Sequence, residues 1–240
     1  LAWSRGLGDV YKRQNINRVG SKNKLKRFRE NETFSNVIQP EREDVLKGKF
    51  PYKGSWRKDF FKNKNPIVLE LGCGKGEYTV HLAQRSPHIN HIGIDIKGAR
   101  FWRGAKTAIE EGYTNVCFIR MQVELIVQCF AEGEVDEIWI TFPDPQIKYK
   151  RTKHRLTQPD LLKIYKTVLK SGGLIHLKTD SEFLFGYTLG VVSQMGVIKY
   201  AHHDIYNNSD APDIATEIQT FYENQFLEKK KAISYMNFTL

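Results

Sequence analysis

Short apolar runs alternate with longer helix-compatible segments over most of this chain. Runs rich in branched apolar residues predict strands over 66–71, 91–96, 116–120, 135–141 and 174–179. The intervening segments predict helices near 76–86, 99–111, 123–131 and 157–171. Gly112 suits the position after the second helix, and Thr157 suits the cap of the fourth, with Pro159 in its first turn. Because strands that alternate with helices form parallel sheets, the pattern predicts an α/β fold.

The remaining segments extend the same architecture to the C-terminus. A helix over 181–195 and a strand near 198–205 precede a loop over 207–213, whose Asn, Asp and Pro residues predict mobility. A helix near 217–230 and an alternating strand over 233–238 complete the chain. The total is seven strands in a mostly parallel, Rossmann-like sheet with helices on both faces, and we expect one domain over 65–240.

Residues 15–64 are basic and aromatic and have no clear hydrophobic period, which predicts an arm or an irregular cap. Cations gather near its start, at Lys22, Lys24, Lys26, Arg27 and Arg29. In 50–57, aromatic residues interleave with cations, and such a mixture suits phosphate contact and base stacking; a solvated tail is the alternative. Residues 1–14 differ in character from the rest, and we interpret them as a foreign or mis-assembled segment.

Composition narrows the class of protein. The 240 residues carry a net charge of +10, which favours a polyanionic partner. The three cysteines form no Cys-x-x-Cys pair, so we expect neither a disulfide framework nor a zinc site, as is usual in a reducing cytoplasm. No apolar run approaches the ~20 residues that span a bilayer, and no signal peptide is evident.

The first strand ends in a glycine-rich turn. Glu70 is followed by Gly72, Gly74 and Gly76, and a predicted helix begins directly afterwards. Glycines allow a tight turn and the close approach of a ligand to the backbone, as in nucleotide-binding units. The spacing is E-x-G-x-G-x-G, whereas dinucleotide sites have G-x-G-x-x-G, so an NAD-dependent enzyme is disfavoured. An ordinary turn between strand and helix is the alternative.

Polar residues follow the other strands at the edge where ligands bind in such sheets. Asp95 can hold both ribose hydroxyls of a nucleotide or cap the next helix, and Gln122 can face an adenine or be a plain surface amide. Asp144 lies between Pro143 and Pro145, which restrict its backbone; it is a catalytic candidate or a turn residue. Asp180 is a site candidate or a helix cap.

A basic run follows Asp144 directly and consists of Lys148, Lys150, Arg151, Lys153, His154 and Arg155. Cations at this edge can bind phosphates while a base is presented to a cofactor. A solvated charged loop is the alternative.

Four segments together are specific: 69–77 around the glycine turn, 93–100 around Asp95, 140–145 with Phe-Pro-Asp-Pro, and 172–180 with Lys-Thr-Asp. They resemble the bacterial tRNA (guanine-N7-)-methyltransferase family over residues 45–240. The resemblance implies a class I S-adenosylmethionine (SAM)-dependent methyltransferase that modifies N7 of a guanine (conventional position 46) in the tRNA variable loop. It also implies a cytoplasmic enzyme with tRNA as partner and no metal or membrane, and we expect a monomer or homodimer.

The resemblance also assigns residues. Glu70, Asp95 and Gln122 match cofactor contacts, and Asp144 matches a cofactor contact that is also the active-site acid. The resemblance and the residue types together predict substrate contacts, namely Lys148, Arg151, Asp180, Thr220 and Glu223, the last two in the family's T-x-[FY]-E segment. Gln122 stands where the family often has Asp or Asn, and Gln146 where it often has Trp.

Two other classes of function remain open. A SAM-dependent methyltransferase acting on another RNA or on a non-RNA substrate would share the cofactor site. A non-catalytic RNA-binding protein would share the basic surfaces and would not bind SAM.

Overall fold

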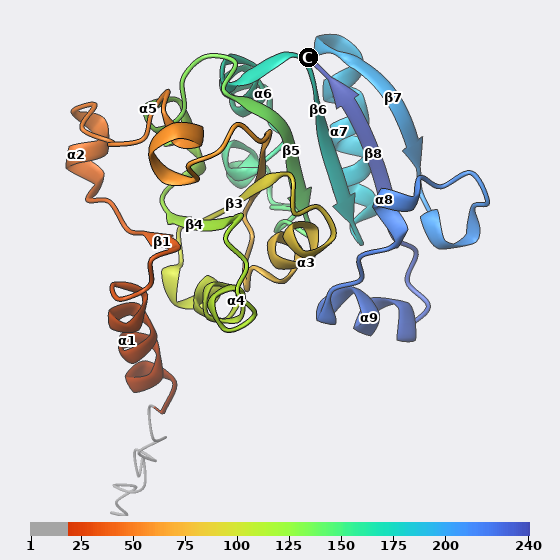
Figure 1. The fold of residues 1–240 in the computed structure, drawn as a ribbon. Coiled ribbons are helices and arrows are strands. Elements are labelled where there is room, and N and C mark those ends of the chain that lie inside the picture. The colour runs from red at the N-terminus through yellow and green to blue at the C-terminus, as the bar shows by residue number, and fades with distance from the viewer. Residues whose placement is uncertain (1–18) are drawn as a thin grey trace, which may run out of the picture.

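The computed structural model describes residues 19–240, with side chains from residue 23 onward. Within this range, eight strands form one sheet in the order β1-β4-β3-β2-β5-β6-β8-β7 (Figure 1). Pairing is parallel from β1 to β6, whereas β8 is antiparallel to both β6 and β7. The strands are β1 (Val37–Ile38), β2 (Ile67–Leu71), β3 (Asn90–Asp95), β4 (Val116–Arg120), β5 (Val135–Thr141), β6 (Leu169–Thr179), β7 (Val197–His202) and β8 (Ser234–Thr239).

The predicted α/β fold with a mostly parallel sheet is confirmed, and the predicted count of seven strands is one too low. The additional strand, β1, is two residues long and extends the sheet by pairing with β4. It arises in the N-terminal region, where no hydrophobic alternation is long enough to predict a strand.

Helices cover both faces of the sheet (Figure 1). On one face lie α3 (Glu77–Arg85) and α4 (Gly98–Glu110), and on the other lie α5 (Ile126–Cys129), α6 (Pro159–Val168) and α7 (Glu182–Met195). The remaining α-helices are α1 (Val19–Asn31), α2 (Arg42–Leu46), α8 (Asp213–Thr216) and α9 (Phe221–Glu228). Short 3₁₀ and π turns span Trp56–Phe60, Val123–Leu125, Tyr149–His154 and Ile205–Asn207.

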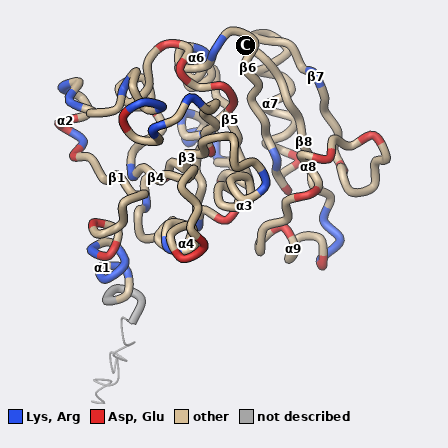
Figure 2. The backbone as a smooth tube through the Cα atoms, in the orientation of Figure 1, with Lys and Arg blue, Asp and Glu red and all other residues tan. Residues whose placement is uncertain are grey.

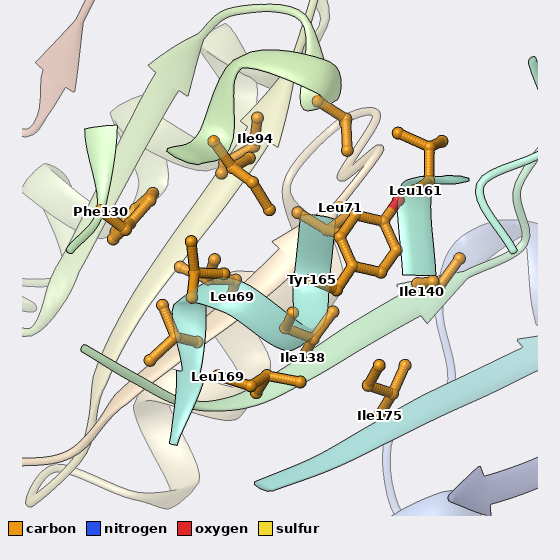
Figure 3. Packing of buried hydrophobic residues seen from close by; sticks show 14 of the residues in the cluster. Leu69, Leu71, Ile94, Phe130, Ile138, Ile140, Leu161, Tyr165, Leu169 and Ile175 are labelled. Carbon is orange, nitrogen blue, oxygen red and sulfur yellow. The ribbon is translucent and has the colours of Figure 1, made fainter. Parts of the chain in front are cut away.

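The central strands are apolar on both faces because both faces are covered. Figure 3 shows Leu69 and Leu71 of β2 packed with Leu161 and Tyr165 of α6. Val68, the residue before Leu69, points to the opposite face and belongs to the cluster there, which contains Tyr78 of α3. This double burial explains why β2 appears in the sequence as a continuous apolar run.

The N-terminal region is more ordered than the predicted irregular arm. Trp56 is completely buried, stacks on Phe130 with ring centroids 5.3 Å apart, and donates its indole N–H to the carbonyl of Cys129. Phe50 is buried beside it. These rings therefore cannot stack on nucleic-acid bases, and this part of the sequence interpretation was wrong. The proposed foreign segment 1–14 and the side chain of Lys22 lie outside the described residues.

Several element boundaries differ from the predictions. Gln158, not Thr157, caps α6, and the Thr157 hydroxyl instead hydrogen-bonds to that of Thr188. The same helix ends at Val168 and not at the glycine pair, because Gly172 and Gly173 lie within β6, where the pairing with β5 shifts in register. Glycines at a strand irregularity thus imitate a helix stop. The predicted helix near 217–230 is shorter, since a Thr220 capping box starts α9 at Phe221.

Among residues 19–240, no helix combines the length and apolar character that a membrane crossing requires.

Candidate active site

A cavity of about 300 Å³, here called the central pocket, lies at the carboxyl ends of β2 and β5. The glycine turn, the N-terminal ends of α3 and α4, and the start of α9 surround it. Its lining consists of Arg27, Glu70, Gly72, Cys73, Gly74, Lys75, Glu77, Tyr78, Ala99, Arg100, Thr141, Phe142, Thr220 and Tyr222. The pocket therefore lies at the edge where the sequence predicts a ligand.

The three glycines of the turn have the backbone conformation for which glycine is needed. Gly72, Gly74 and Gly76 have φ values of 76°, 56° and 75°. A Cβ on Gly76 would come within 2.5 Å of the Phe118 ring and 3.4 Å of Gly104 in α4. The amide of Gly104 in turn donates to the carbonyl of Lys75 at 3.0 Å. Small residues thus allow α4 to pack directly against the turn.

Replacement of Gly76 with alanine tests this packing. We expect Gly112→Ala, at φ 72° with open space around it, to cost about 1 kcal/mol of unfolding free energy. Gly76→Ala should cost about 1–3 kcal/mol more, because Phe118 is buried and stacked on Phe101 and cannot move aside freely. Urea unfolding measures both variants. Equal losses would show that backbone conformation alone explains the requirement for glycine.

Glu70 lies on the pocket wall, and its carboxylate joins three elements. It is buried and accepts hydrogen bonds from Thr79 of α3 and, at 2.5 Å, from Thr141 at the end of β5. Burial raises the pKa of Glu70 to about 7, although the two threonine hydroxyls act in the opposite direction. Glu70 thereby fixes the start of the Phe142 loop relative to the glycine turn.

Asp95 lies beside the glycine turn at the end of β3. Its carboxylate accepts from the backbone amides of Gly74 at 3.1 Å and Lys97 at 2.7 Å. Lys97, and not Asp95, is the cap residue of α4. Asp95 is 8% exposed and lines neither the central pocket nor the cavity at Gln122, and these two amides take two of the about four acceptor positions of its carboxylate.

Gln122 lies in a second cavity, the side pocket, with a volume of about 220 Å³. Its side-chain oxygen accepts a hydrogen bond from Arg42 of α2 at 3.1 Å. The other lining residues, several of them apolar, are Pro40, Glu41, Val45, Ile96, Arg120, Met121 and Leu125. The apolar members suit the flat face of a heteroaromatic ring, and Gln122 together with the charged Glu41, Arg42 and Arg120 could meet its polar edge.

Asp144 is exposed, two residues beyond the pocket wall. Phe142 lines the pocket with φ 45°, and its amide donates to the carbonyl of Lys178 at 2.8 Å. The Asp144 carboxylate accepts from the amide of Gln146 at 3.0 Å. Asp144 is therefore exposed and lies outside the lining of the central pocket.

The basic run divides into exposed and buried members. Lys148, Lys150, Arg151, Lys153 and His154 are exposed. Arg155 is buried, donates to the carbonyl of Gln146 at 3.1 Å, and places its guanidinium over the rings of Phe183 and Tyr187. Arg155 therefore holds the loop against α7 and cannot be counted among its phosphate-binding residues.

The three C-terminal site candidates, Thr220, Glu223 and Asp180, differ in their burial and in their partners. Thr220 lines the central pocket, whereas Glu223 is fully buried and pairs with Lys178 at 2.6 Å. Its carboxylate also accepts from the Tyr206 hydroxyl and, in the capping box, from the amide of Thr220. Glu223 is thus buried in this structure, and its contact with a substrate stays a prediction. Asp180 pairs with Lys231 at 3.1 Å, and Ser181 caps α7 in its place.

Several pocket residues were not assigned a role from the sequence. Tyr78, Arg100, Phe142 and Tyr222 each lie close to a motif residue, so sequence proximity was a usable signal. Arg27 was noted only as one cation of the N-terminal arm, and its place in the pocket depends on the packing of α1 on α4. Within the described range, no group of three His, Cys, Asp or Glu residues is arranged to hold a metal ion.

Comparison with solved structures agrees with this fold. The 16S rRNA methyltransferase KamB aligns with a TM-score of 0.57 at 12% identity, covering 77% of this chain and 91% of that one. A 16S rRNA (adenine(1408)-N(1))-methyltransferase from Catenulisporales acidiphilia, solved with its cosubstrate SAM, aligns with a TM-score of 0.52 at 12% identity. That alignment covers 83% of this chain and 91% of the other. At these identities the likeness concerns the fold, which is that of class I SAM methyltransferases.

Sequence comparison is more specific. A family model described as "Putative methyltransferase" matches residues 64–236. A protein of Christiangramia forsetii named tRNA (guanine-N(7)-)-methyltransferase is 66% identical over 92% of this chain and 100% of its own length. A protein of Bacteroides fragilis with the same name is 47% identical over 91% of this chain and 86% of its own. With this identity over nearly the whole length of both sequences, the chain belongs to the tRNA (guanine-N(7)-)-methyltransferase family.

Proposed function

We propose that this protein transfers a methyl group from SAM to N7 of a guanine in the variable loop of tRNA. The observation that carries the proposal is a glycine-turn pocket with the Asp95 carboxylate beside it, in a chain 66% identical to a protein named for this activity. The exposed cations of the basic run beyond Phe142 support an RNA substrate.

The residues around the two cavities fit SAM. Backbone amides and small residues of the glycine turn would receive its methionine end, with Glu70 on the wall. The free acceptor positions of Asp95 would receive the ribose hydroxyls, and the side pocket with Gln122 would receive the adenine. When bound, SAM supplies an electrophilic methyl group on a sulfonium that is already a good leaving group.

The protein's own contribution is mainly positional. Guanine N7 has a free lone pair and carries no proton, so no general base is required. Alignment of N7 with the methyl group can contribute up to ~7–11 kcal/mol. The methylated base is a cation, and the Asp144 carboxylate, two residues beyond Phe142 of the pocket lining, would stabilise the positive charge as it develops. Asp180 and Thr220 remain candidates for contact with the substrate, whereas the buried Glu223 would act through the start of α9.

The direct test is incubation of the protein with tRNA and labelled SAM, followed by nucleoside analysis. We expect label in 7-methylguanosine, and separation of tRNA fragments before the nucleoside analysis should locate it in the variable loop. Label in another nucleoside would support a methyltransferase with a different RNA target. Binding of tRNA without binding of SAM in calorimetry would support a non-catalytic RNA-binding protein.

Removal of cations from the basic run tests its role in RNA binding. We expect Lys148→Ala and Arg151→Ala to weaken tRNA binding and to reduce the slope of log K against log salt by about 0.7–0.9 each. Lys163→Ala is the matched control, because Lys163 is also exposed but lies on α6 beside Asp160. Unchanged slopes in the first two variants would show that the run is an ordinary solvated loop.

A further inference from the structure

Two arginines from different helices reach the central pocket. Arg27 belongs to α1 and Arg100 to the first turn of α4, and both line the cavity while their side chains remain largely exposed. Among the described residues, neither forms an ion pair with a carboxylate. Two cations that converge on a cavity without acidic partners are arranged to receive an anion.

Helix α1 is docked so that Arg27 has a fixed place. Asn31 donates to the carbonyl of Gly98 at 2.9 Å, and Glu30 accepts from the indole N–H of Trp102 at 2.9 Å and pairs with Lys106 at 3.3 Å. The Arg27 guanidinium lies over the Trp102 ring, 4.8 Å from its centroid. This packing reduces the conformational freedom that Arg27 would lose when it binds a ligand.

Lys75, the third cation in the lining, contacts other side chains of the protein. Its ammonium lies over the rings of Phe221 and Tyr222 at 4.7 and 4.5 Å, and it is 3.9 Å from the Glu77 carboxylate. Lys75 therefore contributes to the contact between the glycine turn and α9. Arg27 also lies over a ring, that of Trp102, but among the described residues neither Arg27 nor Arg100 has a carboxylate partner as Lys75 has in Glu77.

The geometry points to a phosphate of the RNA strand as that ligand, and this inference rests on the proposed function. A base that enters a pocket for chemistry brings its flanking phosphates to the pocket mouth. Arginine presents a planar fork that matches a phosphate group. Figure 2 shows several blue Lys and Arg segments along α1, together with red acidic segments. We infer that Arg27 and Arg100 bind a phosphate next to the target guanine, and that α1 is part of the tRNA-binding surface.

The carboxylate of SAM is another anion that these two arginines could bind. Measurements of tRNA binding and of SAM binding distinguish an RNA phosphate from the SAM carboxylate. Arg27→Ala, Arg100→Ala and Arg27→Lys are compared with Arg29→Ala and Arg103→Ala, which remove exposed arginines from the same helices outside the pocket lining. For each folded variant, the dissociation constant of tRNA is measured against salt, and that of SAM by calorimetry.

For Arg27→Ala and Arg100→Ala we expect about tenfold weaker tRNA binding at low salt and a salt slope reduced by about 0.7–0.9, with SAM binding unchanged. Arg27→Lys should keep the slope and lose part of the affinity, because the charge remains without the fork. Weaker SAM binding with an unchanged tRNA slope would overturn the inference in favour of the cofactor carboxylate. Equal effects from Arg29→Ala and Arg103→Ala would overturn it in favour of diffuse electrostatics. Failure of the proposed function would be visible separately, as absence of 7-methylguanosine with the unaltered protein.

Discussion

Replacement of Lys178 with methionine is expected to lower the free energy of unfolding by about 3–5 kcal/mol, because it leaves the Glu223 carboxylate buried without its cation. Both side chains are completely buried, and the ammonium also donates to the carbonyl of Ile218 at 2.9 Å. Burial lowers the pKa of Lys178, and the adjacent Glu223 carboxylate acts in the opposite direction. Urea unfolding followed by circular dichroism measures the loss.

The same strand contains a matched control. Lys170 of β6 pairs with Asp136 at 2.7 Å, but its side chain is 54% exposed, so Lys170→Met should cost less than about 1 kcal/mol. The double variant Lys178→Met/Glu223→Leu removes both buried charges and should recover most of the stability lost in the single variant. Equal unfolding midpoints for Lys178→Met and Lys170→Met would contradict a structural role for the buried pair.

Features encoded by neighbouring residues were accurately predicted from the sequence. The predicted strands 116–120 and 135–141 coincide with β4 and β5, and Gly112 follows α4 with φ 72° as expected. The glycine turn was also recognisable, because its spacing and the strand before it lie within eleven residues. Such features depend on local backbone geometry, and the residue types there report that geometry directly.

Features that depend on distant partners were missed or misassigned. Arg155 is a basic residue among other basic residues, so the sequence does not distinguish it from the exposed cations of its run. In the structure it is buried, because it donates to a carbonyl of the loop and packs on rings of α7. Glu223 lies three positions after Thr220 of the pocket lining. Its carboxylate is nevertheless buried, because it pairs with Lys178, which lies 45 positions earlier in the sequence. Trp56 lies in a segment without hydrophobic periodicity, so the sequence gives no sign that it is buried. Its burial depends on contacts with Phe130 and Cys129. In each case the deciding contact joins segments whose proximity only the tertiary fold establishes.

For Asp144, the position in the chain was predictable from the sequence, whereas the surroundings of its carboxylate were not. Its position after a strand, between two prolines, was visible in the sequence, and the loop does begin at the pocket wall with Phe142. Its carboxylate, however, is exposed and turned to the amide of Gln146. An exposed carboxylate acts weakly while water surrounds it, so its catalytic role depends on the RNA covering it. That role stays a prediction, and the following substitution tests it.

Asp144→Asn is expected to reduce the rate of methyl transfer by about 10²-fold, because it removes the negative charge that would stabilise the developing guanine cation. Asparagine keeps the size of the side chain and an oxygen that can accept from the amide of Gln146, so the loop should keep its conformation. Single-turnover formation of 7-methylguanosine at saturating SAM and tRNA isolates this step from binding. Asp160→Asn is the matched control, because it removes an exposed carboxylate that pairs only with Lys163 among the described residues. If Asp144→Asn retained the full rate with intact SAM affinity, the carboxylate would have no part in the reaction, and the positioning of N7 by the pocket would have to account for catalysis alone.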